Sequence, residues 1–172
     1  MSPCMAVPPT IRLQYRLLNV FATDAEFSGN PLCVFEDGSA LATEHMQRLA
    51  RQFNLSETTF ILPSESASAS VRIFTPAYEM PFAGHPTLGT SYVVNDLKNL
   101  GGKVQLQMAA GIIPVDSPQS GLWRLMANQP RWRDFEHNIP ELASALSLEA
   151  DDISGPVLWV DSGNEQLLVP VN

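Results

Sequence analysis

The chain has 172 residues, of which 45% are hydrophobic and 16% charged, so it is a globular protein of one domain or two small lobes. Disordered, collagen-like and coiled-coil chains are excluded by this composition. The 18 acidic and 10 basic side chains give a formal net charge of −8 without any cluster of Lys and Arg, which argues against nucleic-acid and membrane partners.

The first half of the chain predicts four strands and a helix. The strands are expected over residues 15–21, 30–35, 58–62 and 70–74, where β-branched and aromatic residues alternate with turn-rich segments. Apolar residues at helical spacing predict a helix over about 43–53, with Thr43 as its N-cap and Asn54 as a left-handed stop.

The second half mixes further strands with two helices. A helix is predicted to begin at Gly84-His85-Pro86-Thr87, with His85 at the cap because proline favours the first helical position, and to end at Gly101-Gly102. The other elements are strands over 103–108, 112–116, 122–127, 157–160 and 166–169 and a short helix over 140–146. Asp116 to Gly121 is the best linker candidate. The fold class is therefore α+β.

The N-terminus and the cysteines favour a cytoplasmic protein. Residues 1–11 lack a basic segment followed by an apolar one, so no signal peptide is expected, and no apolar run reaches the roughly 18 residues of a membrane span. Cys4 and Cys33 cannot form a disulfide framework, and no metal-ligand spacing occurs. We expect Cys33 to be a small core residue.

Glu57 lies where the first helix is expected to end and a strand to begin. One interpretation is a solvated carboxylate at a strand entry, and the other is a general acid/base in a cleft. The second role requires an apolar wall that raises the pKa of Glu57 toward neutral pH.

His85 and its neighbours form the most informative segment. Gly84 allows a ligand to approach the backbone, and the helix start that follows presents free N–H groups to an anion such as a substrate carboxylate. His85 either binds or protonates such a substrate, or only caps the helix. His45 and His137 are expected on the surface.

Three ordered motifs carry a resemblance to a known family. Phe21 with Ser28-Gly-Asn-Pro31, Asn54-Leu-Ser-Glu57-Thr-Thr-Phe60 and Glu79-Met-Pro-Phe-Ala-Gly-His85-Pro-Thr87-Leu-Gly together resemble the PhzF-like isomerases of phenazine biosynthesis. The resemblance runs from about Tyr15 to Val171. It implies a diaminopimelate-epimerase-like fold, in which two lobes, each a β-rich barrel-like sheet around a central helix, enclose a cleft.

The resemblance also implies roles for individual residues. Glu57 matches the proton-shuttling carboxylate and His85 the cleft histidine. Ala83 replaces the cysteine that epimerases of this fold use as a base, so two-cysteine racemisation is not expected. We expect the substrate to be bound by Asn30, Ser56, Gly84, Pro86 and Thr87.

The domain organisation follows from the same resemblance: residues 1–14 form a tail, 15–118 a first lobe and 119–172 the start of a truncated second lobe. Ser162-Gly163-Asn164 repeats the earlier Ser28-Gly29-Asn30, either by chance or as a trace of duplication. Gly84 follows Gly29 by 55 residues, so a duplicated lobe would place the counterpart of Gly84 55 residues after Gly163, near position 218.

The predicted function is a cofactor-independent isomerase that moves a proton within a small carboxylate-bearing metabolite and assembles as a homodimer. Without the second helix start to complete the cleft, these residues alone are expected to turn over no substrate and to associate. The alternative is a non-catalytic, dimerising half-protein that binds a metabolite.

Overall fold

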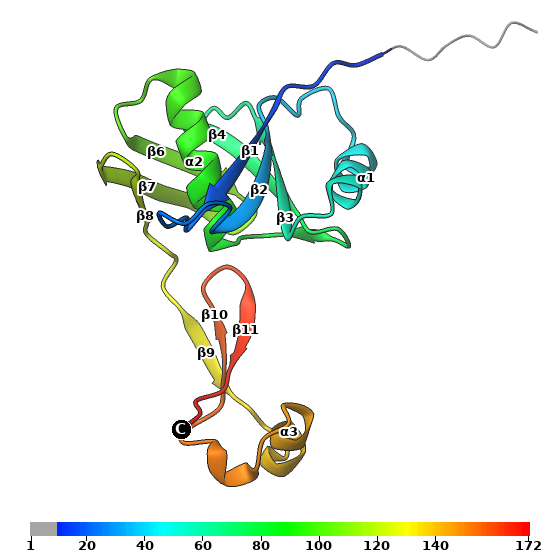
Figure 1. The fold of residues 1–172 in the computed structure, drawn as a ribbon, viewed down its shortest axis with the longest axis vertical. Helices are drawn as coiled ribbons and strands as arrows, with labels where there is room; N and C mark the ends of the chain where they lie inside the picture. Colours follow the sequence, from blue (N-terminus) through cyan, green and yellow to red (C-terminus); the bar gives the residue numbers. More distant parts are fainter. Residues whose placement is uncertain (1–9) are drawn as a thin grey trace, which may run out of the picture.

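The computed structural model describes residues 10–172 and contains two β-sheets. The first has eight strands in the order β1-β2-β3-β4-β6-β7-β8, with β5 paired to β4, and it curls around helix α2 (Figure 1). Its strands are β1 (Tyr15–Val20), β2 (Asn30–Phe35), β3 (Glu57–Leu62), β4 (Ala69–Phe74), β5 (Glu79–Met80), β6 (Lys103–Met108), β7 (Gly111–Gln119) and β8 (Leu122–Leu125).

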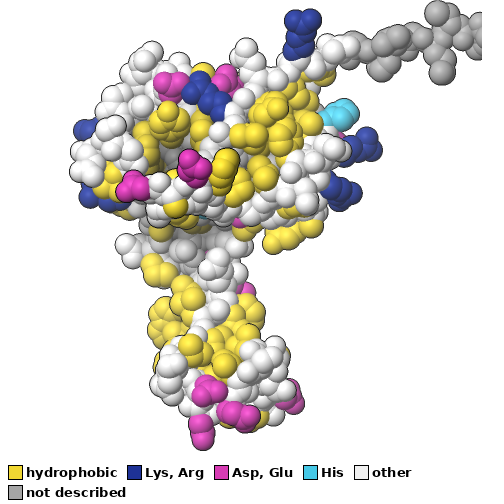
Figure 2. All heavy atoms as spheres, viewed as in Figure 1, with side chains coloured by type: hydrophobic (Ala, Val, Ile, Leu, Met, Phe, Trp, Pro, Cys, Tyr) yellow, Lys and Arg dark blue, Asp and Glu magenta, His cyan; other side chains and the backbone are white. Residues whose placement is uncertain are grey.

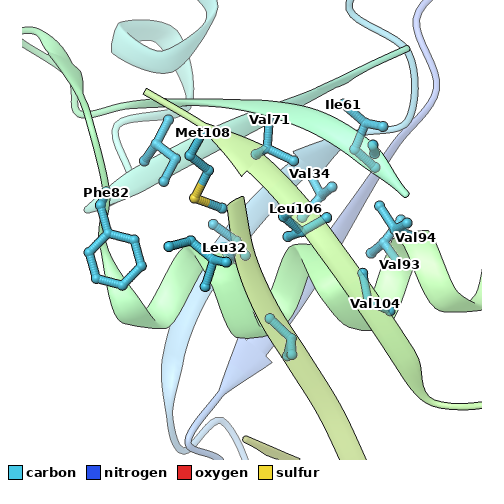
Figure 3. Packing of buried hydrophobic residues seen from close by; sticks show 14 residues of the cluster. Leu32, Val34, Ile61, Val71, Phe82, Val93, Val94, Val104, Leu106 and Met108 are labelled. Carbon is cyan, nitrogen blue, oxygen red and sulfur yellow. The ribbon is translucent and has the colours of Figure 1, made fainter. Parts of the chain in front are cut away.

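Helix α2 (Gly84–Lys98) is the centre of this lobe, and eight of its residues are buried. Its neighbours in the core come from both halves of the sheet, as Figure 3 shows for Leu32, Leu106 and Met108. A Cβ on Gly89 would lie 2.5 Å from Cδ2 of Leu32 and 2.8 Å from Cγ2 of Val20, so a larger residue would force these side chains of the sheet to shift away from the helix.

Helix α1 (Thr43–Phe53) connects β2 to β3, which are parallel, and covers the other face of the sheet. Because side chains alternate along a strand, Leu32 and Val34 of β2 pack with α2, whereas Cys33 and Phe35 pack with Met46 of α1. Strand β2 is therefore buried on both faces, as expected for a run of apolar residues.

A smaller antiparallel sheet, in the order β11-β10-β9, follows the first lobe. Its strands β9 (Arg131–Asp134), β10 (Leu158–Asp161) and β11 (Glu165–Leu168) are accompanied by α3 (Ile139–Ala145) and the short 3₁₀ helix η1 (Ala150–Asp152). The turn between β10 and β11 points toward the first lobe (Figure 1). Hydrophobic side chains lie on both lobes in Figure 2, and several acidic ones gather at the far end of the second.

Most predicted elements are confirmed to within a few residues, including α1, β2 and β6, and Asn54 ends α1 at φ 53° as expected. Three details were wrong. Ala42, not Thr43, is the N-cap of α1, and Ala83, not His85, is that of α2. The linker expected at 116–121 is instead the end of β7 and the turn into β8, since Asp116 pairs with Arg124.

Candidate active site

Glu57 is the first residue of β3 and pairs in register with Leu32 of β2. The left-handed Asn54 ends α1 three residues earlier and turns the chain into the strand. This places the carboxylate at the end of the sheet where α2 begins, with 17% of the side chain exposed.

His85 is the second residue of α2 and is 92% buried, with 8% of its side chain exposed. Its Nδ1 lies 2.9 Å from Oε2 of Glu57, which is hydrogen-bond distance. A carboxylate only accepts hydrogen bonds, so Nδ1 carries the hydrogen and donates it to Glu57. The structure thus brings together two residues that are 28 positions apart in the sequence.

This hydrogen bond favours the charged form of Glu57. The donor on His85 lowers the pKa of Glu57 below its ordinary value of 4.5, with a smaller contribution from Ser56, and outweighs the opposing effect of burial. The requirement for a raised pKa is therefore not met: at neutral pH Glu57 is a carboxylate, suited to take up a proton first.

The second nitrogen of His85, Nε2, is buried and has no hydrogen-bond partner among the described residues. When Nδ1 is protonated in the neutral imidazole, Nε2 is an acceptor. The ring of Phe21 lies beside it, with centroids 6.4 Å apart. An unpaired buried nitrogen costs free energy unless a bound group satisfies it, which makes Nε2 a candidate ligand contact.

Asn30 and Ser56 lie next to this pair. The Ser56 hydroxyl donates to Oδ1 of Asn30 at 3.0 Å, which links the start of β2 to the residue before Glu57. Asn30 follows Gly29, whose φ of +87° and close contact with the carbonyl oxygen of Val20 restrict that position to glycine.

The start of α2 supplies the other expected binding residues. Gly84 and His85 occupy its first two positions, where backbone N–H groups have no partner within a helix. Pro86 has no N–H, and the Thr87 N–H and hydroxyl both donate to the Ala83 carbonyl, the hydroxyl at 2.6 Å. Among the backbone N–H groups of residues 84–87, those of Gly84 and His85 therefore remain available to donate to a ligand.

Several residues lie away from this site. His45 and His137 are exposed, as predicted, and Cys33 is fully buried, which raises the pKa of its thiol to about 12. Across residues 10–172, no three His, Cys, Asp or Glu side chains are grouped as metal ligands would be, and no helix has the length and hydrophobicity of a membrane span.

Phe21 and the turn at Gly163 were not predicted as parts of the site. A Cβ on Gly163 would lie 3.0 Å from Cβ of Phe82, two residues before Gly84. Phe21 belongs to the motifs quoted above, but nothing local in the sequence shows that its ring meets His85. The contact of Gly163 with Phe82 joins residues 81 positions apart, and only the tertiary fold reveals it.

Comparison with known proteins identifies relatives of this chain. The family described as phenazine biosynthesis-like protein, PhzC-PhzF, matches residues 18–172. An uncharacterized isomerase of Pasteurella multocida is 40% identical over 157 residues, covering 90% of this chain and 54% of the relative. The trans-2,3-dihydro-3-hydroxyanthranilate isomerase of Pseudomonas aeruginosa is 38% identical over 141 residues, covering 79% and 50%.

The fold agrees with a solved structure of the same family. A phenazine biosynthesis protein of the PhzF family from Bacillus anthracis superposes with a TM-score of 0.76 at 30% identity, over 94% of this chain and 57% of the other. The α+β class and the sheet around a central helix are thus confirmed. The chain spans about half the length of the curated relatives it matches.

Proposed function

The chain belongs to the phenazine biosynthesis-like PhzC-PhzF family, and from this premise we propose that it carries the acid/base pair of a cofactor-independent isomerase. The substrate is a small carboxylate-bearing metabolite. The hydrogen bond between His85 and Glu57 carries the proposal, because it joins in space the two residues that the family motifs single out.

The proposed reaction moves one proton between two carbons. The Glu57 carboxylate takes a proton from one carbon, so that a C–H bond breaks, an O–H bond forms and the electron pair enters the conjugated system of the substrate. The same oxygen then returns the proton to a second carbon, which restores the carboxylate. His85 orients Glu57 throughout by its N–H donor.

The start of α2 supports the proposed binding mode. A substrate carboxylate accepts the free N–H groups of Gly84 and His85, where the helix dipole favours an anion. Nε2 of His85 then accepts a hydrogen bond from a hydroxyl or amino group of the substrate, which satisfies the buried nitrogen. We assign Asn30 and Ser56, which are hydrogen-bonded to each other beside Glu57, to the polar lining of the same site.

The relatives suggest the first compound to test. Trans-2,3-dihydro-3-hydroxyanthranilate, named as the substrate of the Pseudomonas relative, has a carboxylate and a ring that can accept a relocated proton. In D2O, a full-length two-lobe protein that contains these residues should incorporate deuterium into this compound as it isomerises. Glu57→Gln should lower that rate by about 10²-fold or more, whereas retention of the rate would rule out the proposed role of Glu57.

Assembly and location complete the proposal. We place the protein in the cytoplasm, with a small molecule as its partner, and we divide it into two lobes whose boundary lies after β8 rather than at residue 118, because β8 pairs with β7 in the first sheet. Exposed apolar side chains on the second sheet, including Trp132 and Leu168, support a homodimer. A non-catalytic, dimerising metabolite-binding protein is the alternative; it predicts binding of the compound without deuterium incorporation.

A further inference from the structure

Glu79 opens the third motif quoted above, six residues before His85, and the proposed reaction gives it no role. It forms β5 together with Met80, and this two-residue strand pairs with the end of β4. Two paired residues hold a strand only weakly. Since the segment that follows leads into α2, the position of His85 depends on how β5 is held.

Arg72 of β4 binds the Glu79 side chain through two hydrogen bonds. Its Nε and Nη2 donate to Oε1 and Oε2 of Glu79 at 2.7 and 2.6 Å, a bidentate geometry that fixes the two planar groups relative to each other. Nη1 donates to Oγ1 of Thr43, the first residue of α1, at 2.9 Å. The guanidinium also lies over the ring of Phe74, 5.1 Å from its centroid. Arg72 is therefore itself held in place by α1 and β4.

The turn between β4 and β5 is attached to the same helix. Gln47 of α1 donates from Nε2 to the carbonyl oxygen of Thr75 at 2.8 Å, and Arg51 donates from Nε to that of Pro76 at 3.2 Å. The Thr75 hydroxyl accepts the N–H of Tyr78 at 3.0 Å and closes the turn. The hairpin that carries Glu79 is thus fixed to α1 at its turn and, through Arg72, at its second strand.

Strand β4 is the common reference for both members of the acid/base pair. On one edge it pairs with β3 from the residue after Glu57 onward, and on its other edge it pairs with β5. From Glu79 the chain passes through Phe82, a residue of the core cluster (Figure 3), to His85 in the first turn of α2. The distance of 2.9 Å between Nδ1 of His85 and Oε2 of Glu57 consequently depends on where β5 lies against β4.

We propose that Arg72 and Glu79 are positioning residues, whose bidentate ion pair holds β5 against β4 so that the first turn of α2 presents His85 to Glu57. The inference rests on the proposed function for its effect on the reaction, whereas the geometry concerns the pair alone. The groups that lower the pKa of Glu57 are His85 and Ser56, and Arg72 is not among them. Arg72 and Glu79 therefore act on Glu57 through the position of His85.

Glu79→Ala gives the most direct test, because charge and position predict opposite results. Removing a negative charge would by itself lower the pKa of another carboxyl. Loss of the ion pair should instead let the start of α2 move away from Glu57, which weakens the hydrogen bond from His85 and raises the pKa of Glu57. We expect this rise in a carbon-13 NMR titration of the full chain. Arg72→Lys keeps the charge but loses the bidentate geometry, and should raise the pKa of Glu57 as well.

Two controls separate this effect from a general loss of an ion pair. Asp116→Ala removes a second bidentate pair, in which Arg124 donates from Nε and Nη2 at 3.0 and 2.7 Å between β7 and β8, and should leave the pKa of Glu57 unchanged. In the His85→Phe background, where the donor is already absent, Glu79→Ala should give no further rise. Urea unfolding shows whether each variant is folded, and Arg72→Lys carries the test if Glu79→Ala is not.

The outcomes distinguish this inference from the proposed function. An unchanged or lowered pKa of Glu57 in Glu79→Ala or Arg72→Lys, or a further rise in the His85→Phe background, would overturn the positioning role and leave the proposed reaction standing. In a full-length two-lobe protein, Arg72→Lys should lower the rate of deuterium incorporation about ten- to a hundredfold, since small misplacements of reacting groups are costly. If the unaltered full-length protein incorporates no deuterium, the proposed function fails, and the titrations still decide the positioning role.

Discussion

The hydrogen bond between His85 and Glu57 predicts a stability difference that depends on pH. In Glu57→Gln the side-chain oxygen still accepts from Nδ1 of His85, so the geometry at 2.9 Å is retained while the charge is removed. Hydrogen bonds to charged groups contribute about 1.5–3 kcal/mol and neutral ones about 0.5–1.5 kcal/mol. We therefore expect the variant to lose about 1 kcal/mol of unfolding free energy at pH 7.

The sign of the pH effect follows from the lowered pKa of Glu57. A carboxylate with a folded-state pKa below its unfolded value of about 4.5 stabilises the protein fully above that pH and loses this contribution as the pH falls through the folded-state pKa. The glutamine does not titrate. The difference in unfolding free energy between the two proteins should consequently shrink as the pH is lowered from 7 through this range.

Urea unfolding at a series of pH values from 7 to about 3 measures this difference. Glu65→Gln is the control, because it removes the same formal charge from an exposed side chain. Equal stability of the Glu57 variant and the unaltered protein at pH 7, or a difference that does not change with pH, would refute the assignment of a charge-assisted bond.

Three further predictions concern the core of the first lobe and the hydrogen-bonded pair of His85 and Glu57. Gly89→Ala should lower the free energy of unfolding by about 1–3 kcal/mol, because the new Cβ would lie 2.5 Å from a buried leucine of β2. Gly84→Ala is the control and should unfold at a nearly unchanged urea concentration, since the nearest atom to its Cβ would be 4.0 Å away. With the other cysteine replaced by serine, the native protein should resist iodoacetamide at pH 8, because burial raises the pKa of Cys33 to about 12; reaction without urea would contradict this. His85→Phe removes the donor and should raise the pKa of Glu57, measured by carbon-13 NMR titration; an unchanged value would assign the lowering to another group.

Local signals explain which elements the sequence predicted well. The end of α1 was found because the left-handed conformation of Asn54 is a preference of the residue itself, and β2 because its run of apolar residues is buried on both faces. Strand β9 was missed because Arg131–Asp134 has no apolar alternation and is defined by its pairing with β10. The segment 116–119 resembles a linker in composition, but its partner β8 makes it a strand.

The candidate site was predicted as two separate motifs, and only the fold joins them. Helix α2 passes through the curled sheet so that its first turn meets the start of β3, a contact that depends on the whole order of strands. The direction of the pKa shift of Glu57 was missed for the same reason: burial favours a raised value, and the opposing donor is 28 residues away. The sequence around Glu57 alone does not show that a donor from another segment lies within hydrogen-bond distance.

The lowered pKa of Glu57 restricts the chemistry that the pair can perform. A carboxylate whose charged form is stabilised by His85 is a weaker base than one in an apolar pocket, so in the proposed reaction it removes only a proton that the substrate itself makes acidic. Once protonated, the same group is a stronger acid and returns its proton readily. In the proposed reaction the pair is thus matched to substrates in which a conjugated system lies next to the reacting carbon, and in the proposed binding mode the N–H groups at the start of α2 hold the carboxylate that orients such a molecule. The proposed mechanism therefore predicts that this site selects a substrate by the acidity of its C–H bond as well as by its shape.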